Sequence, residues 1–388
     1  MMNNFYYSIP TKILFGKGQI EHLGETVKVY GKKALLVYGG GSIKKIGLYD
    51  QVIQQLTDQG VGIVEFGGVE PNPRITTVNK GAQICKEQNV EVVLAVGGGS
   101  TIDCAKVIAA AAYYEGDAWD LVNDASKVTK VLPIITVLTL AATGSEMDSY
   151  AVISNMETNE KLGTGHEEMK PKVSILDPEY TYSVSRYQTA AGTADIMSHV
   201  FEEYFERSEG VFLQNRMAEA ILKTCIKYGK IAVEDPENYE ARANLMWASS
   251  LALNGLMHYG RTGGWSVHPM EHELSAFYDI THGVGLAILT PHWMEYVLDE
   301  TSVDKFVEYG VNVWGIDENQ DPYTIAKQAI QSTKEYFISL GIPMSLREVG
   351  IKEDKLELMA KQTTRFGEIK GYKTLNAEAV LEIFKAAY

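Results

Sequence analysis

Short apolar runs and longer amphipathic segments alternate along the first half of the chain. Apolar runs bounded by turn-forming or charged residues predict strands over 5–15, 33–38, 61–66, 92–96 and 131–138. Segments with helical spacing of apolar residues lie between them, over 48–59, 75–88 and 101–113. Because strands alternate with helices in this order, we expect βαβ units that build a parallel sheet.

The pattern changes near residue 185. From residue 187 to residue 388 nearly every segment has helical spacing, and runs of β-branched residues become rare. A chain of 388 residues is also longer than a single hydrophobic core usually supports. We therefore predict an α/β parallel-sheet domain over 1–185, followed by an all-α domain over 186–388.

Composition and charge exclude several classes of protein. The formal net charge of −15 argues against binding nucleic acid, which depends on lysine and arginine side chains that neutralise phosphates. The three cysteines form no Cys-x-x-Cys pair, so neither a disulfide framework nor a thiolate metal site is indicated. The N-terminus lacks a basic and apolar signal segment, and no apolar run is long enough to cross a membrane. We expect a cytoplasmic protein without a nucleic-acid or membrane partner.

Two glycine turns follow predicted strands, at Gly39–Ser42 and at Gly97–Ser100. Neither fits the dinucleotide-binding pattern G-x-G-x-x-G, because Lys44 and Ile102 stand where its third glycine belongs. The second turn nevertheless lies between a buried strand and a predicted helix. The first backbone N–H groups of that helix can face a pyrophosphate.

Asp103 has two compatible roles in this helix. Ser100 and Asp103 have the spacing of a capping box, Ser-x-x-Asp, which is a purely structural device. The same position also suits a carboxylate close to a nicotinamide or a substrate. We therefore keep Asp103 as a candidate catalytic residue.

Histidines concentrate in one segment of the second half. Five of the eight in the chain fall between residues 258 and 292, namely His258, His268, His272, His282 and His292. Neutral imidazole is the commonest protein ligand for transition metals, so this density predicts a metal site. Upstream, Asp195 and His199 are four residues apart, which places both on one face of a helix. An acid–histidine pair on a solvated helix is the alternative explanation of that spacing.

The sequence from His268 to His272 also fits H-x-x-E-H, a metallopeptidase signature. That signature needs both histidines on one uninterrupted helical face. Pro269 instead prefers the first position of a helix, which would leave His268 at the helix cap. A metallopeptidase site would also leave Asp195, His199 and the glycine turns without a role. We therefore keep the metallopeptidase as a remote alternative.

Taken together, these motifs resemble the iron-activated (type III) alcohol dehydrogenases, and within them the butanol dehydrogenase branch. The resemblance covers essentially the whole chain and rests on Gly97–Ser100 with Asp103, Pro71–Pro73, Ala142–Glu146, Lys161, Pro171–Lys172 with Asp177–Pro178, Asp195 with His199, and His268 with His282. It implies a Rossmann-like N-terminal domain that binds a dinucleotide. It also implies a helical, metal-binding C-terminal domain of the dehydroquinate-synthase type, and a homodimer.

The resemblance assigns a role to each candidate residue. It implies that Asp195, His199, His268 and His282 hold one divalent metal, and this ligand set accepts Fe²⁺, Zn²⁺, Co²⁺ or Ni²⁺. His272 is placed near the metal and the nicotinamide without being a ligand. Gly98, Gly99 and Ser100 are assigned to the pyrophosphate, and Asn72, Thr139, Leu140 and Lys161 to the rest of the cofactor site.

The end of the strand over 33–38 favours NADP(H), with NAD(H) as the alternative. NAD-preferring relatives carry an Asp just after this strand, where it accepts a hydrogen bond from a ribose hydroxyl. This chain reads Tyr38-Gly39-Gly40-Gly41-Ser42, so no carboxylate in this run repels a 2′-phosphate. The backbone N–H groups of Gly39 and Gly40 and the hydroxyl of Ser42 can donate to such a phosphate, and Lys44 and Lys45 add positive charge.

The implied activity is the reversible reduction of a short-chain aldehyde such as butanal to the primary alcohol. The metal acts as a Lewis acid, the nicotinamide supplies a hydride, and His272 or a water chain supplies the proton. Three alternatives stay open: a lyase of the dehydroquinate-synthase type, a glycerol-type dehydrogenase of the same superfamily, and a metal-loaded binding protein without turnover. The lyase needs a basic cluster for a phosphorylated substrate, and only Arg261 lies near the proposed ligands in the sequence.

Overall fold

The structure, a computed structural model, describes residues 2–388, which form two compact units. The sheet unit consists of Ser8–Val184 and Pro236–Asn254. The helical unit consists of Ser185–Asp235, Gly255–Tyr388 and the N-terminal residues up to Tyr7. The domain bounds 1–185 and 186–388 stay a prediction. The two units are defined by their compactness, which does not show which part of the chain folds by itself. The units group two segments differently, since Pro236–Asn254 belongs with the sheet and the N-terminal residues with the helices.

Six parallel strands form the main sheet, in the order β1-β8-β5-β4-β2-β3. Their bounds are β1 Lys12–Phe15, β2 Lys33–Tyr38, β3 Gly62–Phe66, β4 Val92–Gly97, β5 Ile134–Leu138 and β8 Val173–Leu176. The central strands β4 and β5 are buried along their whole length, as is usual for continuous apolar runs in a parallel sheet. The predicted α/β class with a parallel sheet is confirmed.

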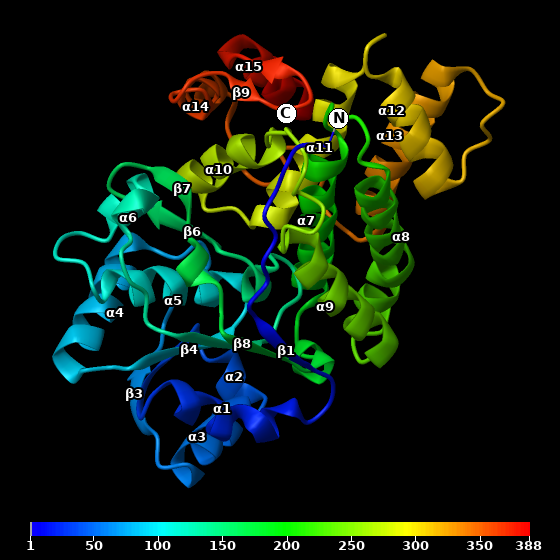
Figure 1. The fold of residues 1–388 in the computed structure, drawn as a ribbon. Coiled ribbons are helices and arrows are strands. Elements are labelled where there is room, and N and C mark those ends of the chain that lie inside the picture. The colour runs from blue at the N-terminus through cyan, green and yellow to red at the C-terminus, as the bar shows by residue number, and fades with distance from the viewer. Residues whose placement is uncertain (1) are drawn as a thin grey trace. The chain divides into compact units, whose positions relative to one another are not determined.

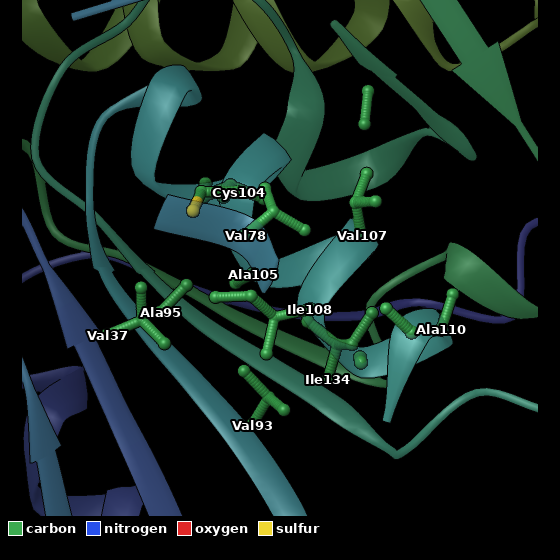
Figure 2. Packing of buried hydrophobic residues seen from close by; sticks show 14 of the residues in the cluster. Val37, Val78, Val93, Ala95, Cys104, Ala105, Val107, Ile108, Ala110 and Ile134 are labelled. Carbon is green, nitrogen blue, oxygen red and sulfur yellow. The ribbon is translucent and has the colours of Figure 1, made fainter. Parts of the chain in front are cut away.

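Helices cover both faces of this sheet (Figure 1). The helices of the sheet unit are α1 Leu23–Tyr30, α2 Ser42–Lys45, α3 Leu48–Asp58, α4 Ile75–Gln88, α5 Gly99–Ala111, α6 Trp119–Asn123 and α9 Tyr239–Leu253. Alternate residues of a strand point to opposite faces, so Leu36 packs with α1 and α3 while Val37 packs with α4 and α5. Figure 2 shows the second face, where Ile108 of α5 lies beside Val93 and Ala95 of β4.

Three parts of the sheet unit differ from the predicted elements. The strand expected over 5–15 is present only as β1, Lys12–Phe15. β8 is not among the predicted strands, because four residues between Lys172 and Asp177 are too few to show a period. An antiparallel hairpin of β6 Tyr150–Asn155 and β7 Glu160–Gly165 is also outside the prediction, since β7 mixes charged residues with glycines.

The helical unit is organised around a long buried helix, α7. Its helices are α7 Arg186–Tyr204, α8 Phe212–Glu234, α10 Val267–Tyr278, α11 His282–Val297, α12 Val303–Tyr309, α13 Pro322–Ser339, α14 Leu356–Thr363 and α15 Ala377–Ala387. α7 packs against α8 and α11, and every residue from Thr189 to Tyr204 is buried. Besides the predicted helices, this unit contains a small antiparallel pair of strands, β9 Ile369–Lys370 with β10 Thr374–Leu375. Within residues 2–388, no helix combines the length and the apolar character that crossing a bilayer requires.

The strand order reverses at β2. The chain passes from β2 to β3 on one side of β2, and then through α4 to β4 on the other side. In open parallel sheets, ligands bind beyond the carboxyl ends of the strands at such a point. The two predicted glycine turns follow β2 and β4, so both lie at this point of the sheet.

Candidate metal centre and cofactor site

Helix α7 carries the first two candidate metal ligands. Asp195 and His199 stand one turn apart on its buried stretch, and His199 Nε2 lies 3.7 Å from Asp195 Oδ1. Burial lowers the pKa of His199 well below its usual value, and the nearby His268 and His282 lower it further. The imidazole is therefore neutral at physiological pH, which is the form that binds a metal.

Glu202, also on α7, binds the start of α10, which carries the third candidate ligand, His268. Its carboxylate accepts hydrogen bonds from the backbone N–H groups of Ser266, Val267 and His268, at 2.7, 2.8 and 2.9 Å, where α10 begins. Its Oε1 atom also lies 3.0 Å from His268 Nδ1. An ionised carboxylate only accepts hydrogen bonds, so Nδ1 of His268 carries the proton and Nε2 keeps its lone pair.

α10 begins two residues earlier than the sequence argument expects. Pro269 is its third residue rather than its first, so His268 lies inside the helix, one turn before His272. Proline is tolerated there because the N–H groups of a first turn have no acceptor within the helix. The expectation that Pro269 leaves His268 at the helix cap is therefore wrong, and Pro269 does not exclude the H-x-x-E-H signature. Glu271 provides the evidence against that signature instead.

His282 is the first residue of α11, and Gly283 follows it. A Cβ atom on Gly283 would lie 2.0 Å from the carbonyl oxygen of Ala191 in α7, so only glycine allows this close approach. The approach brings His282 Nε2 to 3.8 Å from Asp195 Oδ1, while Nδ1 on the other side of the ring contacts Glu271. Glu271 thus holds an imidazole, whereas a metallopeptidase glutamate acts as a general base.

The candidate ligands converge on one point of the helical unit. Donor atoms of Asp195, His268 and His282 all lie within 4.8 Å of one another. His199 joins them by its contact with Asp195 and by stacking on His268, with ring centroids 4.8 Å apart. The buried Nε2 atom of His268 has no hydrogen-bond partner among residues 2–388, as expected of an atom that faces a metal. One carboxylate and three imidazoles suit a divalent metal, so the four residues fit that group.

His272 lies at the edge of this cluster. Its ring centroid is 5.7 Å from that of His282 and 6.4 Å from that of His268. Its side chain is half-buried, whereas His268 is buried. Glu271, His272 and His282 also offer donor atoms within 4.8 Å of one another, but Glu271 already contacts the Nδ1 side of His282. The geometry therefore places His272 beside the ligand set.

The second glycine turn packs against the loop that follows β5. Thr139 donates its backbone N–H to the last carbonyl oxygen of β4, at 3.0 Å. A Cβ atom on Gly98 would lie 3.2 Å from Leu140 Cβ, and one on Gly99 would lie 2.2 Å from the Thr143 hydroxyl. Both glycines therefore allow the N-terminus of α5 to lie close to this loop. The structure thus groups five predicted cofactor residues: Gly98, Gly99, Ser100, Thr139 and Leu140.

Asp103 of α5 binds two residues of the segment that follows β5. Its Oδ1 atom accepts a hydrogen bond from the Ser145 hydroxyl at 2.6 Å, and its Oδ2 atom accepts one from the Val152 N–H at 2.9 Å. The capping-box prediction is wrong, because α5 begins at Gly99 with Gly98 as its N-cap and no side chain caps it. A catalytic role for Asp103 stays a prediction, and these contacts favour a structural one.

Asn72 and Lys161 are both linked to the β6–β7 hairpin, one through its neighbour Pro73 and the other as a residue of β7. Asn72 is in the left-handed region, with φ of 51°, in the turn before α4. The next residue, Pro73, accepts a hydrogen bond from the Ser154 N–H at 2.8 Å, and Ser154 pairs with Lys161 across the hairpin. The Lys161 side chain is buried. Both predicted cofactor residues are therefore tied to one strand, β6.

The first glycine turn connects β2 to the short helix α2. Gly41 has φ of 98°, a conformation that favours glycine. A Cβ atom on Gly39 would come no closer than 3.4 Å to its nearest neighbour, the Val69 carbonyl oxygen, and one on Gly40 would meet open space. Side chains at Gly39 and Gly40 therefore fit the fold, and nothing in the local packing explains these two glycines.

A carboxylate that the sequence argument overlooks stands beside this turn. Glu65 of β3 accepts hydrogen bonds from the hydroxyls of Tyr49, at 2.6 Å, and Tyr38, at 3.1 Å. These bonds, the Tyr49 bond above all, and the nearby Lys44 hold the pKa of Glu65 below its usual value. Lys44 Nζ lies 3.9 Å from Glu65 and over both tyrosine rings. The run after β2 lacks an acid, but the neighbouring strand supplies one.

The contacts of Glu202 and Glu271 with candidate metal ligands are not among the predictions from the sequence. Each contacts the Nδ1 atom of a candidate ligand, and such a contact fixes the tautomer and orientation of the ring. A signal for Glu202 exists, because it follows Asp195 and His199 at helical spacing on the same face. Glu271 belongs to the H-x-x-E-H motif, but the sequence does not indicate its contact with His282, because His282 lies on another helix.

Known proteins are similar to this chain along nearly its whole length. The family model of the iron-containing alcohol dehydrogenases matches residues 10–178, and the model of the C-terminal part of that family matches residues 189–388. The chain is 65% identical to NADH-dependent butanol dehydrogenase A of Clostridium acetobutylicum, over 100% of both chains. It is 40% identical to the NADPH-dependent aldehyde reductase YqhD of Escherichia coli, over 94% of each chain. Among solved structures, NADH-dependent butanol dehydrogenase A of Thermotoga maritima matches with a TM-score of 0.95 at 40% identity, covering 100% of this chain and 99% of that one.

The two family models together account for nearly the whole chain. The relatives include the butanol dehydrogenases that the sequence resemblance indicates. The resemblance is therefore confirmed, and the chain belongs to the family of iron-containing alcohol dehydrogenases.

Proposed function

We propose that the chain interconverts short-chain aldehydes and primary alcohols, such as butanal and butanol, with a nicotinamide cofactor. The observation that carries this proposal is the convergence of Asp195, His268 and His282 donor atoms within 4.8 Å, with His199 beside them. The names of the relatives, butanol dehydrogenase and aldehyde reductase, support the same substrate class. A basic cluster for a phosphorylated substrate, which a lyase of the dehydroquinate-synthase type needs, does not accompany the ligands in the sequence.

In this proposal the chain holds its metal through Asp195, His199, His268 and His282. Fe²⁺, Zn²⁺, Co²⁺ and Ni²⁺ all suit this set, and affinity order alone does not select one of them. When bound, the metal supplies Lewis acidity toward a carbonyl oxygen and the nicotinamide supplies a hydride. Glu202 and Glu271 keep His268 and His282 in the tautomer that presents Nε2 to the metal.

The proton for the product oxygen is assigned to His272. Its imidazole is half-buried beside the ligand set, and it is not needed as a fifth protein ligand. Histidine is the commonest general acid because its usual pKa lies near neutrality. Asp103 is a weaker candidate for a catalytic role, because both of its carboxylate oxygens already accept hydrogen bonds.

The experiment for this function adds butanal and NADPH or NADH to protein reconstituted with one divalent metal. We expect steady loss of absorbance at the reduced-nicotinamide band, which depends on the metal. A lyase that uses its dinucleotide transiently would give no net oxidation, and a metal-binding protein without turnover would give no change. Faster oxidation of glycerol than of butanol in the reverse reaction would support the glycerol-type dehydrogenase instead.

The preferred nucleotide is proposed to be NADP(H), with NAD(H) as the weaker substrate. Among the relatives, one is named NADH-dependent and another NADPH-dependent, so the proposal rests on residues of the turn after β2. Gly39, Gly40 and Ser42 offer backbone and hydroxyl donors without a carboxylate, and local packing does not require either glycine. Glu65 offsets part of the charge of Lys44, so we expect a preference rather than strict selection.

Substituting Gly39→Asp should reverse or weaken this preference. The new carboxylate would repel a 2′-phosphate and accept a hydrogen bond from a ribose hydroxyl. We expect kcat/KM for NADPH to fall at least about tenfold relative to NADH, which corresponds to about 1.4 kcal/mol. A Cβ atom fits at this position, since its nearest neighbour would be 3.4 Å away.

Gly39→Asn is the matched control for that substitution, because it has the same shape without the charge. It should change the NADPH to NADH ratio much less than Gly39→Asp does. An unchanged ratio in Gly39→Asp, or a wild-type protein that ignores NADPH, contradicts the nucleotide proposal. Either result leaves the metal site standing.

A homodimer is proposed to form through β1. This strand is at the edge of the sheet, and among residues 2–388 it pairs with β8 alone, so its other side has backbone groups without a strand partner there. Phe15 and Trp247 are 38% and 39% exposed and pack edge to face there, beside a hollow that Ile13 also lines. Light scattering that gives the mass of one chain would contradict the proposal.

A cytoplasmic location also stays a prediction.

A further inference from the structure

Two consecutive acids at the end of α7 organise the loop that leads to His268. Glu202 binds the start of α10 and the His268 ring, as described above. Glu203 binds a different part of the same loop: its Oε1 atom accepts a hydrogen bond from the indole Nε1 of Trp265 at 2.9 Å. Both oxygens of Glu203 also lie 3.1 Å from His258 Nδ1. The proposed chemistry uses neither Glu203 nor Trp265.

The indole of Trp265 lies against two of the proposed ligands. Its ring centroid is 4.5 Å from that of His268, with an interplanar angle of 49°. The distance to the ring of His199 is 5.6 Å, with an angle of 47°. His199 and His268 are themselves stacked, with centroids 4.8 Å apart and an angle of 23°. One indole therefore contacts both members of a stacked imidazole pair.

The bond to Glu203 decides how firmly this indole is held. The Glu203 side chain is only 6% exposed, so the carboxylate is a buried acceptor in a fixed place on α7. A charged acceptor in a buried place makes a strong hydrogen bond to its donor. Trp265 itself follows two glycines, Gly263 and Gly264, in a loop without regular structure. Among residues 2–388, the indole N–H has one hydrogen-bond partner, Glu203, and this bond ties the side chain of Trp265 to α7.

We infer that Trp265, anchored by Glu203, is a positioning residue for the metal centre. The inference rests on the proposed metal ligands, and it adds to that site two residues that do not bind the metal themselves. The indole restrains the ring planes of His199 and His268, so that both rings present a nitrogen toward Asp195 before a metal arrives. The electron-rich face of an indole also favours rings that carry positive charge, as imidazoles do once a divalent cation binds them.

Simple loop packing is the competing explanation of the same contacts. In that case the loss of Trp265 would lower the stability of the fold but leave the metal centre with unchanged affinity and geometry. Groups that orient metal ligands typically change metal affinity by about 10- to 100-fold when they are removed. The two explanations are therefore separated by measurements on the bound metal.

The test compares Trp265→Ala, Trp265→Phe and Glu203→Gln with the wild type. Co²⁺ is titrated into metal-free full-length protein in competition with a chromophoric chelator, and the visible absorption of the bound Co²⁺ is recorded. We expect Trp265→Ala to bind Co²⁺ about 10- to 100-fold more weakly and to shift the absorption bands. Trp265→Phe keeps a ring but loses the donor to Glu203, and Glu203→Gln keeps the indole with a neutral acceptor. Smaller changes in the same direction are expected for both variants.

Trp314→Phe is the matched control, because Trp314 packs against Tyr309 and Tyr336 in the same unit. It should leave both the affinity and the spectrum unchanged. Tryptophan fluorescence checks only that the indole of Trp265 lies beside the bound metal, since Co²⁺ quenches a nearby indole. Quenching should persist in Trp314→Phe and largely disappear in Trp265→Phe.

The outcomes distinguish a failure of the positioning role from a failure of the proposed metal site. Unchanged Co²⁺ affinity and absorption in Trp265→Ala would overturn the positioning role while leaving the proposed function intact. If the wild type binds no Co²⁺, the proposed metal site fails and this inference fails with it. Thermal unfolding of the metal-free proteins identifies a variant that does not fold. If Trp265→Ala is such a variant, Trp265→Phe and Glu203→Gln decide the question by the same two readings.

Discussion

Replacing His268 with Ala should remove both bound metal and aldehyde reduction. His268 contributes a buried Nε2 atom to the cluster, and water cannot easily replace it there. Lewis-acid stabilisation by a metal contributes several kcal/mol, and about 1.4 kcal/mol corresponds to a tenfold change in rate. We therefore expect kcat/KM for butanal to fall at least about 10³-fold. Metal content after reconstitution and NADPH oxidation are the two measurements.

Asp195→Ala should give the same double loss, because Asp195 lies within ion-pair distance of both His199 and His282. His22→Ala is the control, since His22 is an exposed histidine of the sheet unit that pairs with Glu25. It should change neither metal content nor turnover. Metal-free His268→Ala protein that reduces butanal at the wild-type rate would show that the chemistry does not depend on this site.

The sequence predicts the fold wherever a strand is long enough to show its period. β2, β4 and β5 are buried on both faces and appear as continuous apolar runs, so their places in a parallel sheet follow from the pattern. β8 is just as buried but has only four residues. Its identity depends on pairing with β1 and β5, which are distant in the sequence, so no local pattern marks it.

The candidate site also contains residues that local spacing predicts and residues that it does not predict. Asp195 and His199 are recognisable from their spacing, because one helix places them together. His282 reaches Asp195 through the contact of α11 with α7, which depends on a close approach at Gly283. Spacing cannot predict that contact, and only the resemblance to a known family indicates it. The start of α10 is also set from a distance, because Glu202 rather than Pro269 fixes its first turn.

The surroundings of the turn after β2 include a residue from the neighbouring strand. The run after β2 contains no acid, yet Glu65 on β3 stands 3.1 Å from the Tyr38 hydroxyl. Adjacent parallel strands end at the same edge of a sheet, so a residue on one contributes to the surroundings of the other. In the nucleotide proposal, selectivity therefore depends on two strands and the helix α2, because Glu65 lies 3.9 Å from Lys44 and offsets part of its charge.

Replacing His272 with Ala should lower turnover while leaving the metal in place. His272 is beside the ligand set, 5.7 Å from the ring of His282, and the proposed coordination does not include it. A positioned general acid typically contributes about 10²- to 10⁴-fold, so we expect kcat for butanal reduction to fall about 10²-fold. Metal content per chain should stay close to the wild-type value.

Three further measurements make that result specific to proton transfer. His292→Ala is the control, because this histidine is also on a helix of the same unit but pairs with Glu295. It should retain turnover. A small imidazole buffer should restore part of the activity of His272→Ala, because it can supply the missing proton, whereas it should not help His268→Ala. The Co²⁺ absorption of His272→Ala should match that of the wild type. Loss of the metal from His272→Ala would instead make His272 a ligand, and would return attention to the H-x-x-E-H signature together with Glu271.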